Sequence, residues 1–374
     1  MRTPIESPER PDSDRAALQR PRPEIRQILA QLPHYLALGT AAAAILFAGV
    51  WVLFIASNTS LGPAIDNPKD FFITLLNGVT AAGLYFVVAS GFTLIFGLMR
   101  VVNLAHGSFF LLGGYIALRL QRDLVGGDSA FGLMSGQVSL ANWVLPLLIA
   151  ATIIAASGLV TQQFLLRWNQ GQDLRQALIT IALSIILADQ MLAHFGGIAQ
   201  DISWPRTLDT FVNLRLYGIN YPVTRLFILG LAIAIGGLLW LWLKKTRTGM
   251  VIRAGVDDPA MVSALGINIQ RTFAITFLVG SALAGIGGVI GGSFAGLAPG
   301  VDGQWLLNSL VVVIIGGMGS LGGAAVGSLL FGLVTSFSAA YLPENYTFYS
   351  VIFTFALLAV VLAFRPYGLF GKAA

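Results

Sequence analysis

The stretch GQWLLNSLVVVIIGGMGSLGGAAVGSLLFGLVTSFSAAYLP, residues 303–343, contains no Asp, Glu, Lys or Arg. As a single helix these 41 residues would be about 60 Å long, twice the roughly 30 Å hydrocarbon core of a bilayer. The run must therefore fold back on itself, and we expect the turn in the glycine-rich segment GGMGSLGG, residues 316–323. The stretch predicts two antiparallel helices that cross a membrane.

The composition of the whole chain agrees with a membrane protein. Of its 374 residues, 56% are hydrophobic and 10% are charged, against about 25% charged residues in soluble domains. Cysteine is absent, which excludes disulfides, thiol catalysis and thiolate metal sites. The net charge of the chain is +5. In a membrane protein an excess of Lys and Arg is typical of cytoplasmic loops that lie near anionic lipid, so we do not take it as a sign of nucleic-acid binding.

Hydropathy predicts an all-α, polytopic integral membrane protein with about ten transmembrane segments. Residues 71–118 are broken only by Arg100, so they form two spans with a turn near LMRVVN. The predicted spans are 35–56, 71–99, 101–118, 143–166, 176–195, 226–243, 272–297, 304–316, 320–342 and 346–364. Residues 1–34 are rich in Arg, Pro and Asp, and we expect a disordered cytoplasmic tail there.

The distribution of basic residues predicts the orientation. With the N-terminus inside, the inner segments hold 16 Lys and Arg and the outer segments hold 6, so the positive-inside rule places both termini in the cytoplasm. The outer residues are Lys69, Arg119, Arg122, Arg206, Arg215 and Arg225. Residues 244–271 then form a cytoplasmic loop, residues 366–374 a cytoplasmic tail, and residues 119–142 and 196–225 longer outer loops.

Several kinds of chemistry are missing from the sequence. It has no GxxxxGK[ST] phosphate loop, no HExxH and no GxSxG, and its three histidines are dispersed. We therefore expect neither an enzyme nor a bound cofactor or metal. Transport is the function that ten spans favour.

Polar residues inside the predicted spans are the candidates for a translocation path. Asp189 lies well within a span, about 9 Å from its predicted outer end, where it could bond a neighbouring helix, line the solute path or couple protons. Asn103 and His106 could satisfy the backbone at the re-entry turn or line an inner gate. Asn77 and Asn308 are more central and must face protein or water.

The segment VDDPAMVSALGIN, residues 256–268, reads as a short soluble helix between two apolar runs. Asp258 is a suitable N-cap, Pro259 suits the first helical position, Asp257 adds charge at the positive helix end, and Gly266 is a suitable stop. Its small apolar stripe consists of Ala260, Met261, Ala264 and Leu265. So short a helix needs a surface to dock on, which could be lipid, the protein's own bundle or a groove on a cytoplasmic partner.

Glycines recur at close-packing spacing in the span 272–297. Gly287 and Gly291, and likewise Gly288 and Gly292, are four residues apart, a spacing that lets helix backbones approach closely in lipid. They could pack the bundle itself, form a subunit interface or form a sliding surface.

Three motifs, in order, resemble the permeases of ATP-binding-cassette (ABC) importers for branched-chain amino acids. Residues 75–117, LLNGVTAAGLYFVVASGFTLIFGLMRVVNLAHGSFFLLGGYIA, resemble the family's N-terminal signature. Residues 247–290, RTGMVIRAGVDDPAMVSALGINIQRTFAITFLVGSALAGIGGVI, resemble its coupling loop and following helix, and VVVIIGGMGSLGGAAVGSLLFGLV, residues 311–334, its C-terminal segment. The resemblance covers residues 71–365, and the NLAHG form favours the first of two paired paralogues.

The resemblance implies a set of partners and a coupling site. The partners are a second permease subunit, two cytoplasmic ATPases and a periplasmic solute-binding protein, assembled in the inner membrane. Residues 257–266 would be a coupling helix seated in an ATPase groove. The extra span at 35–56 and the long outer loop at 119–142 depart from the family pattern.

The sequence thus supports a leading function and two alternatives. The leading hypothesis is the membrane-spanning subunit of an ATP-driven importer of branched-chain or related amino acids. Related permeases carry urea or short amides, which is the first alternative. An ion-coupled carrier or channel that uses Asp189 is the second.

Overall fold

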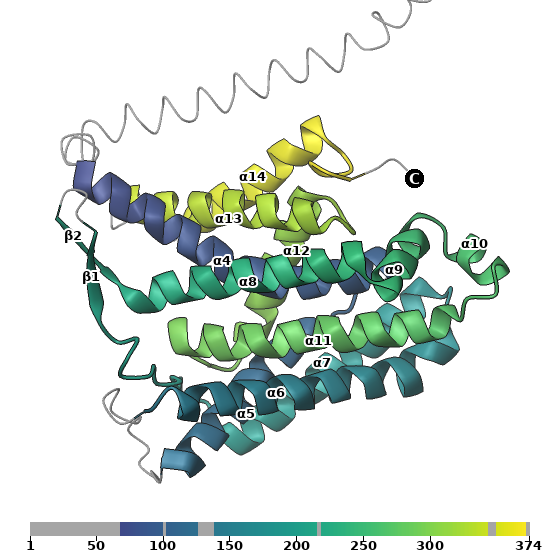
Figure 1. Cartoon of the computed structure of the whole chain (residues 1–374), viewed down its shortest axis with the longest axis horizontal. Helices are drawn as coiled ribbons and strands as arrows, with labels where there is room; N and C mark the ends of the chain where they lie inside the picture. Colours follow the sequence, from purple (N-terminus) through teal and green to yellow (C-terminus); the bar gives the residue numbers. More distant parts are fainter. Residues whose placement is uncertain (1–67, 100–101, 126–137, 215–217, 343–348, 372–374) are drawn as a thin grey trace, which may run out of the picture. The chain divides into compact units, whose positions relative to one another are not determined.

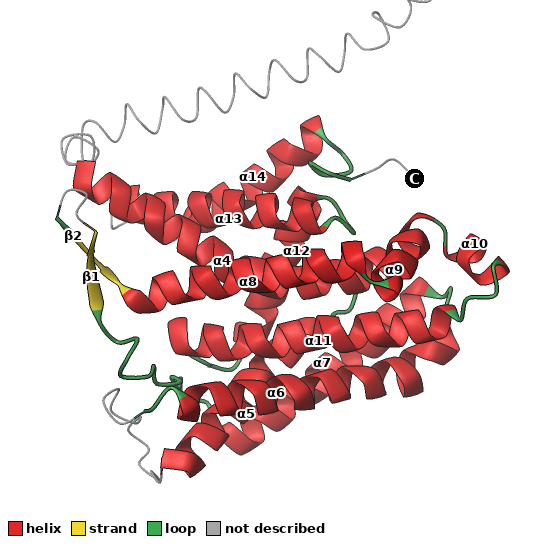
Figure 2. Cartoon of the chain, viewed as in Figure 1, coloured by secondary structure: helices red, strands yellow, loops and turns green. Residues whose placement is uncertain are grey.

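The computed structural model describes residues 68–99, 102–125, 138–214, 218–342 and 349–371 (Figure 1). The predicted tail 1–34 and the predicted span 35–56 lie outside these residues. Within them the chain is almost entirely helical (Figure 2).

The described part of the chain contains eleven α-helices, and each predicted span within it corresponds to one long helix. The long helices are α4 (Pro68–Met99), α5 (His106–Val125), α6 (Ala141–Val160), α7 (Asp173–Phe195), α8 (Val223–Lys245), α11 (Ile269–Phe294), α12 (Val301–Gly316), α13 (Leu321–Tyr341) and α14 (Ser350–Phe364). A π-helical turn η3 (Thr161–Leu166) and a 3₁₀ turn η4 (Arg167–Asn169) extend α6, and the short helices α9 (Arg247–Asp257) and α10 (Pro259–Ala264) follow α8.

The predicted turn in GGMGSLGG is confirmed. Helix α12 ends at Gly316 and α13 begins at Leu321, with Ser320 as its N-cap accepting from the backbone N–H of Gly323 at 3.0 Å. Gly317 and Gly319 adopt φ of 101° and 81°, a region that glycine enters without steric cost.

Six of the described helices are long and apolar enough to cross a membrane, and α12 and α14 are shorter apolar helices. Helix α4 is the longest, with 32 residues, or about 48 Å, so it exceeds the hydrocarbon thickness of a bilayer. It packs against α8, α11, α12 and α13. Its buried hydroxyls bond carbonyls of the preceding turn: Thr93 donates to Ala89 at 2.7 Å and Ser90 to Val87 at 2.8 Å, so polar side chains are satisfied within an apolar core.

Glycine allows α11 to approach α4 and α5 closely. A Cβ atom at Gly288 would collide with the carbonyl oxygen of Phe110, and one at Gly287 would lie 2.5 Å from the side chain of Val88. A Cβ atom at Gly291 would lie 2.5 Å from the ring of Phe110, and one at Gly292 would lie 2.9 Å from Ile202. All four glycines named from the sequence therefore lie at contacts within this chain.

A short hairpin and a polar cluster fasten one end of the bundle. Strands β1 (Phe211–Leu214) and β2 (Ile219–Pro222) pair antiparallel and lie at the end opposite α9 and α10 (Figures 1 and 2). The side-chain oxygen of Asn77 accepts from the Tyr221 hydroxyl at 3.0 Å and from the Arg225 guanidinium at 2.6 Å. This cluster ties α4 to the hairpin and to the start of α8.

Replacing Gly288 with Ala is predicted to destabilise the protein by about 3 kcal/mol, because the added methyl group meets the backbone of α5 and the collision can be relieved only by separating two helices. Thermal unfolding of the purified protein in detergent measures the effect. Gly230→Ala, in α8, is the matched control: a Cβ atom there has no neighbour within 4 Å, so its melting temperature should not fall. Equal melting temperatures for the two variants would contradict this packing.

Candidate functional site

Two regions of the fold carry features that close packing alone does not explain. The first is the segment that follows α8, residues 246–268. The second is a polar cluster where α5 and α12 begin.

The first region contains the predicted short helix. The Asp258 carboxylate accepts from the backbone N–H groups of Ala260 and Met261, at 2.9 and 3.0 Å, and so caps α10. Gly266, with φ of 78°, closes the helix, since its N–H donates to the Ser263 carbonyl at 3.0 Å. The cap and the stop expected from the sequence are therefore both present.

The apolar stripe of α10 faces away from the rest of the chain. Met261 is 60% exposed and Leu265 is 71% exposed, and Ala260 and Ala264 are exposed with them. Val262, 2% exposed, is the residue that anchors the helix. A helix of six residues is too short to be stable in isolation, so an apolar face left open to water is a candidate contact surface.

Helix α9 connects α10 to the membrane-spanning bundle. Thr246 caps α9 by accepting from the N–H of Gly249 at 3.0 Å, and Ile252 of α9 is buried in an apolar cluster, which we call the α9 cluster. The cluster joins α9 to the ends of α4, α8 and α11; its members are Leu98, Met99, Trp242, Leu243, Ile252, Val256, Ile269 and Phe273. Force applied to α10 would therefore reach three long helices through side-chain contacts.

The turn between α12 and α13 lies next to the α9 cluster. A Cβ atom at Gly319 would lie 3.2 Å from the Cα of Gly97 in α4 and 3.4 Å from Val256 in α9. The α9 cluster thus also adjoins the turn that begins α13.

The second region begins where the chain re-enters the bundle after α4. The Nε2 atom of His106 lies 3.0 Å from the carbonyl oxygen of Val88, which is 11 residues before the end of α4, or about 16 Å along its axis. Because a carbonyl only accepts, Nε2 carries the hydrogen. Helix α5 therefore starts deep inside the bundle, about half a hydrocarbon core from the end of α4.

Helix α12 begins at the same depth. Asp302, its second residue, is buried and accepts from the Ser108 hydroxyl at 3.2 Å. Ser108 in turn lies 2.8 Å from the Ser184 hydroxyl of α7. A Cβ atom at Gly107 would collide with the Asp302 carbonyl, so glycine is required where α5 and α12 cross.

The segment between α11 and α12 is irregular, and its backbone groups are satisfied by another loop. The N–H and the carbonyl of Leu297 both pair with Gln200, at 2.7 and 2.9 Å, and Leu297 is fully buried. Irregular backbone at membrane depth is tolerated where it is buried in protein or lines a cavity. This segment does both.

A cavity of about 360 Å³ lies between α5, α7 and this segment. Its polar lining consists of Asp189, Asp302 and Tyr115. The hydroxyl of Tyr115 is buried and has no hydrogen-bond partner within the described residues. Such a volume falls within the roughly 300–1,000 Å³ of ligand pockets.

The remaining candidates for the path lie elsewhere. Asn77 sits in the hairpin cluster described above. Asn103 is buried, and its side-chain oxygen accepts from the N–H of Ala105 at 3.2 Å, while its amide nitrogen has no partner among the described residues. Asn308 is half-buried on α12. Of the five predicted residues, the structure brings Asp189, which is exposed, to the cavity wall and places His106, which is buried, at the start of α5.

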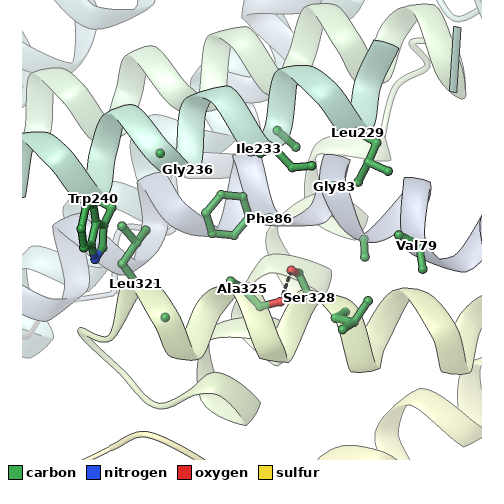
Figure 3. Close-up of a pocket in the computed structure, with 15 residues that line it drawn as sticks. Val79, Gly83, Phe86, Leu229, Ile233, Gly236, Trp240, Leu321, Ala325 and Ser328 are labelled. Atoms are coloured by element: carbon green, nitrogen blue, oxygen red, sulfur yellow. Dashed lines mark hydrogen bonds between the residues drawn. The ribbon is translucent and has the colours of Figure 1, made fainter. Parts of the chain in front are cut away.

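A second hollow, shown in Figure 3, has a different character. It lies between α4, α8 and α13, and it is lined by apolar and small residues that include Phe86, Ile233, Trp240 and Leu321. Its one hydroxyl, that of Ser328, donates to the carbonyl of Ala325 in its own helix at 2.8 Å. The lining of this groove is therefore mainly hydrocarbon, without a charged side chain.

Sequence reasoning missed Asp302, Tyr115 and Val262. Asp302 directly precedes the charge-free run and was not named as a candidate, although a carboxylate next to the predicted span 304–316 was an available signal. Tyr115 lies in a glycine-rich span, where the sequence alone indicates only a packing role for an aromatic residue. No group of three or more His, Cys, Asp or Glu residues that could hold a metal ion occurs in the described part of the chain.

The six long apolar helices define a multi-pass membrane protein. A family model described as branched-chain amino acid transport system / permease component matches residues 74–362, and this match places the protein in the transport class. This chain belongs to that family.

Three relatives show the extent of the similarity. The chain is 28% identical to the high-affinity branched-chain amino acid transport system permease protein LivH of Escherichia coli (strain K12), over 81% of this chain and 96% of LivH. It is 29% identical to BraD of Pseudomonas aeruginosa, another high-affinity branched-chain amino acid permease protein, over 80% of this chain and 95% of BraD. Similarity to LivM of Escherichia coli (strain K12) is 25%, over 78% of this chain and 68% of LivM. No solved structure matches the chain significantly.

Replacing Asp258 with Ala is predicted to loosen α10, since the loss of an N-cap costs about 1 kcal/mol. Amide hydrogen exchange of residues 260–265 should become about fivefold faster, which corresponds to that free energy for local opening. Asp258→Asn retains a capping oxygen and should exchange like the wild type. Unchanged exchange in the alanine variant would show that the cap does not hold this helix.

Proposed function

We propose that this chain is the membrane-spanning subunit of an ABC importer for branched-chain or related amino acids, working by alternating access. Its proposed location is the inner membrane, with both termini in the cytoplasm. The family membership and the names of LivH and BraD support the solute class. The observation that carries the proposal is the exposed apolar face of α10 on a chain whose sequence has no phosphate loop.

The energy source in this proposal is a pair of cytoplasmic ATPase subunits. Helix α10 docks in a groove of an ATPase, the mode in which a short amphipathic helix gains stability from its partner. The proposed coupling residues are Asp257, Asp258, Pro259, Ala260, Met261, Ala264, Leu265 and Gly266. Motion of α10 passes through α9 and the α9 cluster to α4, α8 and α11.

The remaining proposed partners are a second permease subunit and a periplasmic solute-binding protein. LivH and LivM are both named as permease proteins of the same type of system in one organism, and this chain matches LivH over nearly its whole length. That pattern supports a heterodimer in which this chain takes the LivH position.

The charges near α8 and α9 support the proposed orientation. Lys244 and Lys245 end α8, and the Lys244 ammonium lies 4.6 Å from the centre of the Trp240 ring. Lysine and tryptophan side chains of this kind sit at the membrane–water boundary. The α9 and α10 end of the bundle would then face the cytoplasm.

The double variant Met261→Asp/Leu265→Asp should lower ATP-dependent leucine uptake at least about tenfold, because two desolvated anchors of the docking face become charged. The ATPase subunits should also be lost when the complex is purified through this chain. Uptake into proteoliposomes and the subunit composition of the complex are the measurements.

Met318→Asp is the control for this experiment. Met318 is 50% exposed in the turn between α12 and α13, outside the proposed docking face, and uptake should stay within about twofold of the wild type. Wild-type uptake and ATPase association in the double variant would refute the coupling role. Solute flux through the purified chain without ATPases, abolished by Asp189→Asn, would favour the ion-coupled alternative.

A further inference from the structure

The cavity between α5, α7 and residues 299–302 has a two-sided lining. One side is polar and acidic, with Asp189, Asp302 and Tyr115. The rest is aliphatic, formed by Leu111, Ile185, Ala188, Met191, Leu192 and Pro299. The lining therefore matches a ligand with a cationic head and an aliphatic body.

The acidic side lacks a cation. Neither Asp302 nor Asp189 forms an ion pair among the described residues, and the polar contact of Asp302 is the neutral hydroxyl of Ser108 at 3.2 Å. Asp302 is buried, and a buried carboxylate without a cationic partner is costly at membrane depth. Asp189 completes the acidic side from the exposed face of α7. The site is thus electrostatically complementary to a positive charge.

Tyr115 supplies an independent observation. Its ring is 1% exposed and is held by stacking on Phe195, with ring centres 4.4 Å apart and planes at 13°. Its buried hydroxyl has no protein partner within the described residues, although buried hydroxyls nearly always find one. A ligand in the cavity that can donate a hydrogen bond would satisfy it.

We infer that this cavity binds the α-ammonium group of the transported amino acid through Asp302, Asp189 and Tyr115, with the aliphatic wall receiving the branched side chain. The inference rests on the proposed function and names the recognition chemistry of its solute. An ammonium group has three donors, which match two carboxylates and one hydroxyl. A bare metal ion fits less well, since hard cations take six or more oxygen ligands and this lining is mainly hydrocarbon.

The position of the cavity fits a step in transport. It is lined by α5, α7 and the start of α12, and Ser108 of α5 links Asp302 to Ser184 of α7 by hydrogen bonds. Asp189 lies on α7 and Asp302 on α12, so a displacement of these two helices relative to each other would change the distance between the two carboxylates. The affinity of the site for the ammonium group would therefore fall when these helices move.

The test uses the complete transporter in proteoliposomes, with enclosed ATP, saturating binding protein outside and radiolabelled leucine. Asp302→Asn and Asp189→Asn should each lower the leucine taken up per ATP hydrolysed by about 10- to 100-fold, the usual effect of losing a hydrogen bond to a charged group. ATP hydrolysis should continue. Asp123→Asn is the control and should change nothing, since Asp123 pairs with Arg119 on the exposed side of α5 at 3.5 Å.

A binding measurement separates ammonium recognition from general effects. Leucine, but not 4-methylpentanoic acid, which lacks the ammonium group, should raise the melting temperature of the detergent-solubilised complex in the absence of binding protein. Tyr115→Phe should reduce that shift in melting temperature. If the Asp302→Asn variant does not assemble into the complex, Tyr115→Phe and Asp189→Asn are the variants used for the test.

Three results would overturn the inference. They are wild-type uptake per ATP in both aspartate variants, equal stabilisation by leucine and 4-methylpentanoic acid, or a sodium requirement of the wild type that Asp302→Asn removes, which would mark an inorganic cation site. Failure of the wild-type complex to import leucine, isoleucine or valine with ATP would instead refute the proposed function.

Discussion

Close contact between helix backbones is the constraint on which the structure depends. In a bilayer, moving an apolar side chain from lipid into a helix interface provides no hydrophobic free energy. Helices therefore associate through close van der Waals packing. Gly288 lies against the carbonyl of Phe110, and Gly107 lies against the carbonyl of Asp302. The first contact fixes α11 against α5, and the second fixes the start of α12 against the start of α5. Together they set the position of the acidic side of the cavity.

The two functional regions are built from different helices of the bundle. The α9 cluster holds the ends of α4, α8 and α11 beside α9, while the polar cavity is lined by α5, α7 and residues 299–302. Because α11 packs on α4 and α5 along its glycine face, a displacement at the α9 end has a rigid route to the cavity wall. The apolar groove in Figure 3 lies on another face of α4.

The sequence predicted the long helices of the described residues, six of which are long and apolar enough to cross a membrane, because each depends on a local property, the length of an apolar run. It also predicted the turn in GGMGSLGG and the cap of α10, where glycine and aspartate act on neighbouring residues. The cavity could not be predicted from the sequence. Asp302 and Ser108 are 194 positions apart in the chain, and their hydrogen bond depends on how three helices cross. Helix α9, the β1–β2 hairpin and the late start of α5 at His106 were missed for the same reason: tertiary contacts, such as that of His106 with Val88, determine them.

The most direct test of coupling through α10 is site-specific photocrosslinking. Because the chain has no cysteine, the Leu265→Cys variant carries one thiol in this chain, to which a thiol-reactive photocrosslinker can be attached in the complete transporter. Activation in membranes should link this chain to an ATP-binding subunit, with a yield that changes when ATP is added. The same label at Phe211→Cys, on the exposed β1 strand at the other end of the bundle, should give no such product. Crosslinking to the ATP-binding subunit from Phe211 and not from Leu265 would contradict both the docking surface and the orientation.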